Sequence, residues 1–256
     1  MSDLEISIRN GVQTIRFNRP EKKNALKSDM YAAMTEALSK GDASADVTSH
    51  LFIGSGGVFT SGNDIAEFLE RSNGGSALGT PVIGFIRGLA EVKKPMIAAV
   101  DGLAVGIGTT LLFHCDLVYA TPSASLRTPF LDLGLVPEAG SSLLAPQRMG
   151  YARAFELLVL GEPFSAERAR EAGIVNAIVP ADQLEAIALQ AAARLAAKAP
   201  EALAVSRRLM RGDPSPIVAR VDKEVKIFGA RLSSPEAKEA FAAFLEKRKP
   251  DFAKLR

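Results

Sequence analysis

The chain has 256 residues, of which 47% are hydrophobic and 23% charged, a composition typical of a globular protein with one large domain or a domain plus a helical extension. Its formal net charge of +2 is too small to indicate nucleic-acid binding, and a single cysteine, Cys115, excludes an internal disulfide framework. Two histidines without a Cys/His cluster give no reason to expect a metal site. The longest apolar run, residues 96–113, contains Asp101 and several glycines, so we expect no membrane span.

Short apolar runs alternate with amphipathic segments up to about residue 200, which predicts a mixed α/β core. Asn10-Gly11 is a strong turn dipeptide and predicts a hairpin between the first two strands. Strands are expected at residues 6–8, 12–17, 51–53, 96–100, 117–120, 125–127 and 175–179. Helices are expected from Ser28, as a cap, to about Ser39, from near Asp64 with Ile65, Phe68 and Leu69 on one face, and over residues 81–92, 107–113, 141–144 and 152–160. The Gly/Ser-rich residues 72–80 predict a mobile loop.

The last part of the chain has a different pattern, because no strand-like run follows Pro200. Asp182 and Glu185 have the spacing of a capping box and predict a helix to about Lys198. Further helices are expected over residues 201–210, 217–231 and 235–249, the last with a Ser234-Pro235 start. We therefore divide the chain into a mixed core, residues 1–199, and a helical C-terminal region, residues 200–256. A few helices alone bury little area, so this region is expected to pack on a neighbour.

Two glycine-containing turns precede expected helices and could direct backbone N–H groups at one ligand atom. They are Ser61-Gly62-Asn63-Asp64 and Val105-Gly106-Ile107-Gly108. Two such donors aimed at one oxygen form an oxyanion hole, which stabilises charge that develops in a transition state. From spacing alone, ordinary tight turns are the simpler interpretation. The second turn is not a dinucleotide fingerprint, because Leu111 stands in place of the third glycine.

A third feature is Glu138, a lone carboxylate among small and apolar residues in the segment 133–142. Burial would raise its pKa and make it a proton acceptor and donor near neutral pH. The alternative is a first-turn glutamate at the surface that complements a helix dipole, and from these residues alone it is the favoured interpretation.

Four motifs, in their order and spacing, resemble those of the crotonase superfamily, the enoyl-CoA hydratases and isomerases. They are Asn18-Arg19-Pro20 with Asn24-Ala25-Leu26, Phe59-x-Ser61-Gly62-Asn63-Asp64-Ile65, Asp101-Gly102 with Gly106-x-Gly108 and Cys115-Asp116, and Leu133-Gly134 with Pro137-x-Ala139-Gly140. The resemblance implies an α/β fold, a crotonase-like spiral of ββα turns with a C-terminal helical trimerisation region. It also implies self-association as a trimer or a dimer of trimers. The substrate would be an acyl-CoA thioester, and no separate cofactor is expected because coenzyme A is part of the substrate.

The resemblance also assigns the chemistry. It places the oxyanion hole at the backbone N–H groups of Asn63 and Ile107, and the catalytic glutamate of Δ3,Δ2-enoyl-CoA isomerases, closest in motif to the peroxisomal type, at Glu138. The two glutamates of hydratases are replaced by Thr110 and Phe130. We therefore expect an enzyme that moves a double bond from C3 to C2, with Phe130 helping to keep water out. The alternatives are a hydratase or another crotonase activity, and a non-catalytic protein that binds CoA thioesters.

Coenzyme A contacts carry over from the same resemblance. The residues expected along the pantetheine and adenine are Lys23, Ala25, Leu26, Ser61 and Ile65, with Lys247 at the 3′-phosphate and Phe228 near the adenine of a neighbouring subunit. Lys247 could also be a solvated charge and Phe228 could be helix core. The N-terminus lacks a transit-like pattern and the C-terminus is not Ser-Lys-Leu, so we expect a cytoplasmic protein.

Overall fold

The computed structural model describes residues 2–65 and 78–255 of the chain. In these residues, six strands form a main sheet in the order β1-β2-β3-β4-β6-β9, and three short strands form a second sheet in the order β5-β7-β8. In the main sheet β1 pairs antiparallel with β2, and each later pair of neighbours is parallel. The strands are β1 (Leu4–Arg9), β2 (Val12–Phe17), β3 (Ser49–Gly54), β4 (Met96–Val100), β5 (Leu103–Val105), β6 (Leu117–Ala120), β7 (Ser125–Arg127), β8 (Phe164–Ser165) and β9 (Ala177–Ile178).

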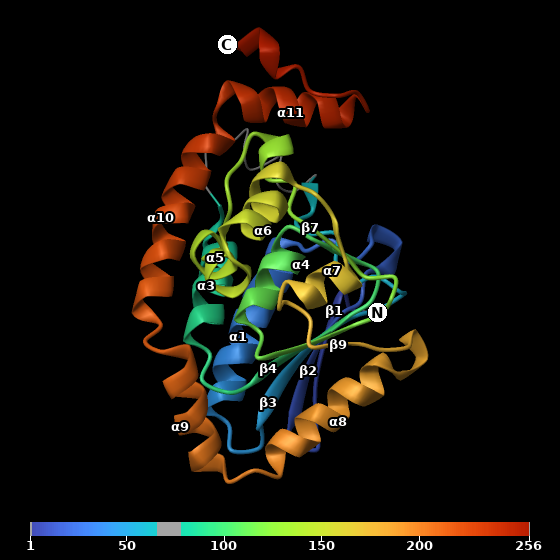
Figure 1. Ribbon diagram of the computed structural model, residues 1–256, viewed down its shortest axis with the longest axis vertical. Coiled ribbons are helices and arrows are strands. Elements are labelled where there is room, and N and C mark those ends of the chain that lie inside the picture. Colours follow the sequence, from blue (N-terminus) through green and yellow to red (C-terminus); the bar gives the residue numbers. More distant parts are fainter. Residues whose placement is uncertain (1, 66–77, 256) are drawn as a thin grey trace.

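Helices surround the main sheet and form the C-terminal part of the chain (Figure 1). The α-helices are α1 (Ser28–Ala43), α3 (Thr80–Glu91), α4 (Ile107–Thr110), α5 (Ser141–Met149), α6 (Tyr151–Phe155), α7 (Ala166–Glu171), α8 (Leu184–Ala196), α9 (Pro200–Arg211), α10 (Ser215–Leu232) and α11 (Pro235–Leu245). Shorter 3-10 or π turns are η1 (Pro20–Lys22), η2 (Leu111–His114), η3 (Leu131–Leu133), η4 (Glu156–Leu160), η5 (Ala181–Gln183) and η6 (Phe252–Leu255).

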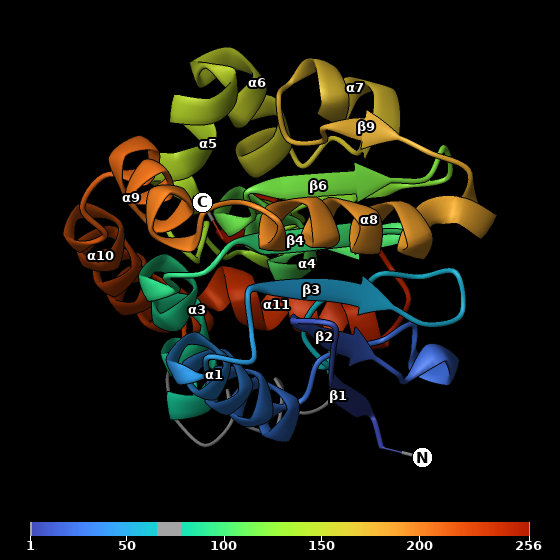
Figure 2. The same ribbon diagram turned by 90° about the horizontal axis from the view of Figure 1, so that it is seen from below.

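Strand β4 shows how the sheet divides the core. All five of its residues are buried, because helices cover both faces of the sheet. Ile97 and Ala99 belong to a hydrophobic layer shared with α8, which lies across one face of the sheet (Figure 2). Ala98 and Val100 point the other way, into the larger core that α1 and α3 help to form. Side chains alternate across a strand, so the apolar run seen in the sequence serves two layers at once.

The C-terminal helices follow the sheet without a further strand in the described residues. Helix α10 runs along one side of the molecule and α11 crosses its end (Figure 1). Helix α10 contacts α3, α5 and α11, so this region packs extensively on the core of its own chain. The division of the chain at residue 200 stays a prediction.

Several predicted elements agree with the structure, and others differ for reasons that can be identified. The hairpin, the central strands and the cap at Ser234, whose Oγ accepts from the Ala237 N–H at 3.1 Å, are confirmed. Ser28 is the first residue of α1 and does not cap it, and the helix runs on to Ala43. Helix α5 continues through Pro146 because its later residues are packed: Ala145 is buried and Arg148 donates to two carbonyls of η2.

The capping box predicted before α8 was wrong. The chain instead enters the helix through the 3-10 turn η5, and the start of α8 has no side-chain cap. Glu185 pairs with Arg16 of β2 at 2.5 Å, so its carboxylate connects the helix to the sheet. The predicted strand at 175–179 contracts to two residues, and the last predicted helix ends at Leu245. Phe68, Leu69 and most of the predicted loop 72–80 lie outside the described residues, whereas Thr80 begins α3.

Candidate active site

The first two sequence motifs lie side by side because a short parallel pairing joins them. Leu26 and Asn63 form an isolated β-bridge, and the Ser61 N–H donates to the Lys23 carbonyl at 2.9 Å. Thr60, just before, forms a second bridge with Ala104 of β5. The pairing therefore brings together four of the predicted coenzyme A contacts, Lys23, Ala25, Leu26 and Ser61, with Ile65 shortly after them and half-buried.

The two glycine-containing turns are also neighbours. A Cβ added to Gly62 would lie 2.8 Å from the Val105 carbonyl oxygen, so only glycine allows this approach. Gly62 and Gly106 have φ of 87° and 57°, values that glycine adopts without strain. Within the hydrogen bonds of the described residues, neither the Asn63 nor the Ile107 backbone N–H donates to the protein. Two N–H groups in adjoining turns can thus receive a ligand oxygen.

Two side chains hold the Asn63 turn: Tyr31, which no sequence motif includes, and Arg19 of the first motif. The Tyr31 hydroxyl of α1, itself 1% exposed, donates to the Asn63 Oδ1 at 2.5 Å. Arg19 binds the Asp64 carboxylate at 2.7 Å and so ties the first motif to the second. These contacts fix the turn from outside, which leaves the Asn63 backbone N–H available.

Glu138 is buried, with 6% of its surface exposed, so the surface alternative is wrong. Its Oε1 accepts a hydrogen bond from the Thr110 hydroxyl at 2.5 Å. Burial raises the pKa of Glu138 to about 8, the Thr110 bond opposes the rise, and the nearby Glu224 carboxylate adds to it. Thr110 lies on α4, which begins at Ile107, so the carboxylate is bonded to the same short helix that carries one of the two free N–H groups. A carboxyl group in this state can both accept and donate a proton near neutral pH.

The loop that carries Glu138 is fixed on its other side by His114. The His114 Nε2 lies 2.7 Å from the Ala139 carbonyl oxygen, and burial lowers the pKa of His114 to about 4. The ring is therefore neutral at physiological pH and donates from Nε2. Ala139 itself has a φ of 55° and no exposed surface, a conformation that a non-glycine residue keeps only when its surroundings enforce it.

The remaining predicted contacts have different surroundings. Phe130 is buried at the start of η3, and its carbonyl accepts from the Leu135 N–H at 2.8 Å, so it supports the loop before Glu138. Phe228 is only 2% exposed and belongs to the core of its own chain, which corrects the predicted contact with a neighbour's adenine: the ring is helix core. Lys247 is exposed, with a φ of 53°, directly after the last helix, and remains a predicted phosphate contact.

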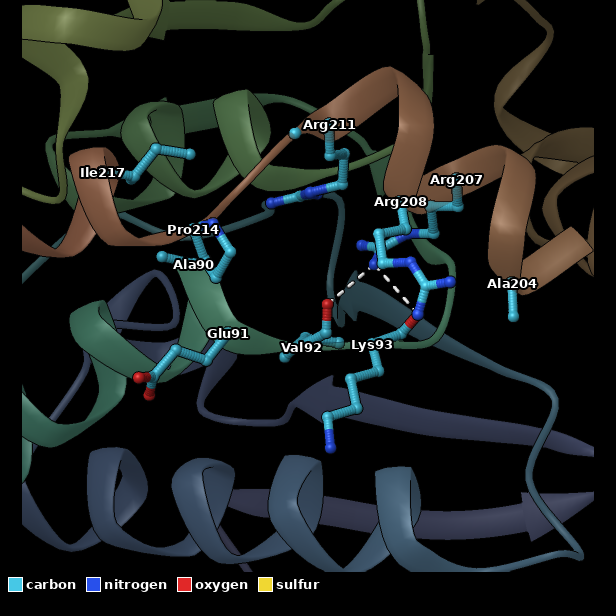
Figure 3. Close-up of a pocket in the computed structure, with 11 residues that line it drawn as sticks. Ala90, Glu91, Val92, Lys93, Ala204, Arg207, Arg208, Arg211, Pro214 and Ile217 are labelled. Atoms are coloured by element: carbon cyan, nitrogen blue, oxygen red, sulfur yellow. Dashed lines mark hydrogen bonds between the residues drawn. The ribbon is translucent and has the colours of Figure 1, made fainter.

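Cys115 and Asp116, at the end of the third motif, have structural roles. Cys115 is buried, and burial raises the pKa of its thiol to about 12, so the thiol stays protonated. Asp116 accepts from the Met96 N–H and pairs with Arg207 of α9 at 2.9 Å. Figure 3 shows Arg207 also donating to the carbonyls of Val92 and Lys93, at one end of a cleft of about 320 Å³. Neither glycine turn nor Glu138 lines this cleft, so it is separate from the candidate active site.

No helix in residues 2–65 and 78–255 is long and apolar enough to cross a membrane. In the same part of the chain, no group of three or more histidine, cysteine, aspartate or glutamate side chains is placed to hold a metal ion.

The chain matches the family model "Enoyl-CoA hydratase/isomerase" over residues 7–255. It is 35% identical over 245 residues to enoyl-CoA delta isomerase 2 of Rattus norvegicus, covering 94% of this chain but only 62% of the rat protein's length. It is 30% identical to the 2,3-dehydroadipyl-CoA hydratase of Escherichia coli, covering 98% of this chain and 99% of that protein. A crystal structure of an enoyl-CoA hydratase/isomerase from Pseudoalteromonas atlantica superposes with a TM-score of 0.92 at 40% identity, over 98% of this chain and all of that one. The chain therefore belongs to the enoyl-CoA hydratase/isomerase family of the crotonase superfamily and has the crotonase fold.

Proposed function

We propose that this enzyme isomerises enoyl-CoA thioesters by moving a double bond from C3 to C2, with Glu138 as the only proton shuttle. The observation that carries the proposal is the state of Glu138: buried, bonded to Thr110, and with a pKa raised to about 8. A group of this kind takes a proton from C2 of the substrate and returns it at C4. The acidity of C2 comes from the thioester carbonyl, whose oxygen becomes negative when the proton leaves.

The oxyanion hole supplies the second requirement of this reaction. The free N–H groups of Asn63 and Ile107 would hold the thioester oxygen as the dienolate forms. Preorganised donors of this kind typically contribute about 3 to 4 kcal/mol of transition-state stabilisation each. The glycines beside them are what allow the two turns to approach each other.

Hydration is the competing activity, since some relatives of this chain are named hydratases. The side chains at positions 110 and 130, where the family resemblance places the two hydratase glutamates, argue against hydration. Thr110 is already bonded to Glu138, and Phe130 is a buried hydrocarbon ring. Neither can hold and deprotonate a water molecule, so Glu138 would carry out proton chemistry that needs no added water.

The other parts of the proposal follow from the family. The substrate is an acyl-CoA, which the paired segments around Lys23 and Ser61 would contact along the pantetheine. Exposed apolar side chains on the C-terminal helices, among them Leu209, Met210 and Phe244, support assembly as a trimer or a dimer of trimers. No cofactor beyond the coenzyme A of the substrate is proposed, and the proposed location is the cytoplasm.

The test compares wild type with Glu138→Gln, which keeps the size and the acceptor for Thr110 but cannot take up a proton. Isomerisation of a 3-enoyl-CoA should fall at least about a thousandfold, while binding of a saturated acyl-CoA changes little. Glu36→Gln on α1 is the matched control, because Glu36 is exposed and paired only with Lys40. A Glu138→Gln enzyme that isomerises at the wild-type rate would refute the assignment, and loss of acyl-CoA binding in the same variant would indicate a collapsed site.

A further inference from the structure

A second carboxylate, Glu224 of α10, lies close enough to Glu138 to influence its charge. Glu224 is buried, with 5% of its surface exposed, on the inner face of a helix whose other buried residues are Val221, Phe228 and Leu232. A carboxylate on an otherwise apolar helix face is costly to bury unless its oxygens are fully hydrogen-bonded. The hydrogen-bond partners of Glu224 therefore indicate the role of this carboxylate.

All of these partners belong to the segment that follows Glu138. One Glu224 oxygen accepts from the Gly140 N–H at 2.6 Å, and the other accepts from the Ser142 N–H at 3.0 Å and from the Ser142 hydroxyl at 2.5 Å. Arg220, one turn earlier on α10, donates to the same Ser142 hydroxyl oxygen at 3.1 Å. Every partner of Glu224 is thus a donor, which is the environment of an ionised carboxylate.

The C-terminal helices hold the Glu138 loop at both ends. At the far end, the Gly140 Cα faces α10 so closely that an added Cβ would meet Ile217 at 3.1 Å. At the near end, Arg231 of α10 donates to the Gly134 carbonyl at 3.1 Å, and a Cβ on Gly134 would lie 2.7 Å from the Ala237 nitrogen of α11. The loop between these glycines has no regular structure of its own, so its position depends on these contacts.

We propose that Glu224 is a positioning residue for Glu138, through which helix α10 fixes the loop that carries the base and places a second negative charge beside it. The inference rests on the proposed function. The negative charge makes the ionised form of Glu138 less favourable, so that Glu138 remains partly protonated near neutral pH and can return the proton that it takes.

The other charged groups around this pair do not replace that effect. Burial raises the pKa of Glu224, and its bonds to Ser142 and Gly140, together with the charge of Arg220, oppose that rise. His114 contacts the loop from η2 but is neutral at physiological pH. Asp222, on the same helix, is half-exposed and paired with Arg87 of α3 at 3.2 Å. It offers a control in which α10 loses an equal charge on a different face.

The test is a titration of Glu138 in the substrate-free enzyme, followed by the 13C signal of its carboxyl carbon and assigned by its absence in Glu138→Gln. In Glu224→Gln the pKa of Glu138 should fall by roughly half a unit or more, and the acidic limb of the kcat/KM profile for isomerisation should fall with it. Asp222→Asn should leave both unchanged. Glu224→Asp keeps the charge but shortens the side chain, so it should lower kcat without lowering the pKa of Glu138.

Two results would overturn the inference: a Glu138 that titrates in Glu224→Gln as it does in wild type, or a Glu224→Asp enzyme with the kcat of wild type. The second variant keeps the inference testable if Glu224→Gln does not fold. Because the titration needs no substrate, an enzyme without isomerase activity would refute the proposed function and still report whether Glu224 acts on Glu138.

Discussion

Replacing Glu138 by glutamine should stabilise the protein at neutral and alkaline pH, although it removes the proposed base. Burial raises the pKa of Glu138 from its ordinary value of 4.5 to about 8. Between these two values the folded protein binds a proton that the unfolded chain has lost, so the free energy of unfolding of wild type falls as the pH rises. Glutamine does not ionise and avoids this loss.

The size of the effect follows from the same two pKa values. The stability advantage of Glu138→Gln over wild type should be absent near pH 4.5 and reach about 3 kcal/mol at pH 7 and about 4 kcal/mol at pH 8. Urea unfolding of both proteins between pH 5 and 8, at one protein concentration, measures the difference. Stability curves that stay parallel over this range would show that Glu138 titrates normally, and the case for a raised pKa would fail.

Three further substitutions test individual contacts. Thr110→Val removes the donor to Glu138, so the acidic limb of the isomerisation profile should move up by about one pH unit; an unmoved limb would show that this bond does not act on the base. Tyr31→Phe frees the Asn63 side chain and should lower kcat about tenfold with less effect on KM, whereas unchanged steady-state kinetics would contradict its role in holding the oxyanion turn. Arg207→Ala removes one partner of the half-buried Asp116 carboxylate and the donor to two carbonyls, so it should cost about 2 to 3 kcal/mol in the free energy of unfolding; a melting temperature within a degree of wild type would contradict this.

Features set by local backbone requirements could be predicted from the sequence. The glycines at 62 and 106 mark places where the backbone needs positive φ or a close approach, and the structure places the two turns beside each other. The run Met96–Val100 could be recognised as a buried strand because all of its residues are apolar. The mixed core followed by helices could be read from the change in apolar pattern near Pro200.

The environment of Glu138 could not be predicted in the same way, because distant segments create it. Thr110 lies 28 residues away along the chain, and Glu224 reaches Gly140 across 84 residues. From the residues around Glu138 alone, a surface helix start is the favoured interpretation and a buried base the alternative. The same limit explains Phe228, whose burial depends on how α10 packs against the core.

The prediction errors at helix ends also have non-local causes. Helix α8 starts without the predicted capping box because Glu185 is engaged by Arg16 of β2. Helix α5 passes Pro146 because packing around Ala145 and the bonds of Arg148 outweigh the missing N–H. In both helices a tertiary contact overrides the local preference, which is the capping-box spacing before α8 and the helix-ending tendency of Pro146 in α5.

The most direct test of the central claim measures two reactions on one enzyme preparation. A 3-enoyl-CoA and a 2-enoyl-CoA of the same chain length are supplied separately, and isomerisation of the first is compared with hydration of the second. A site with Glu138 as its only proton-transferring carboxylate predicts rapid isomerisation and hydration slower by at least about two orders of magnitude. Hydration as fast as isomerisation would show that water is activated without glutamates at positions 110 and 130, and would contradict the proposal of a single proton shuttle.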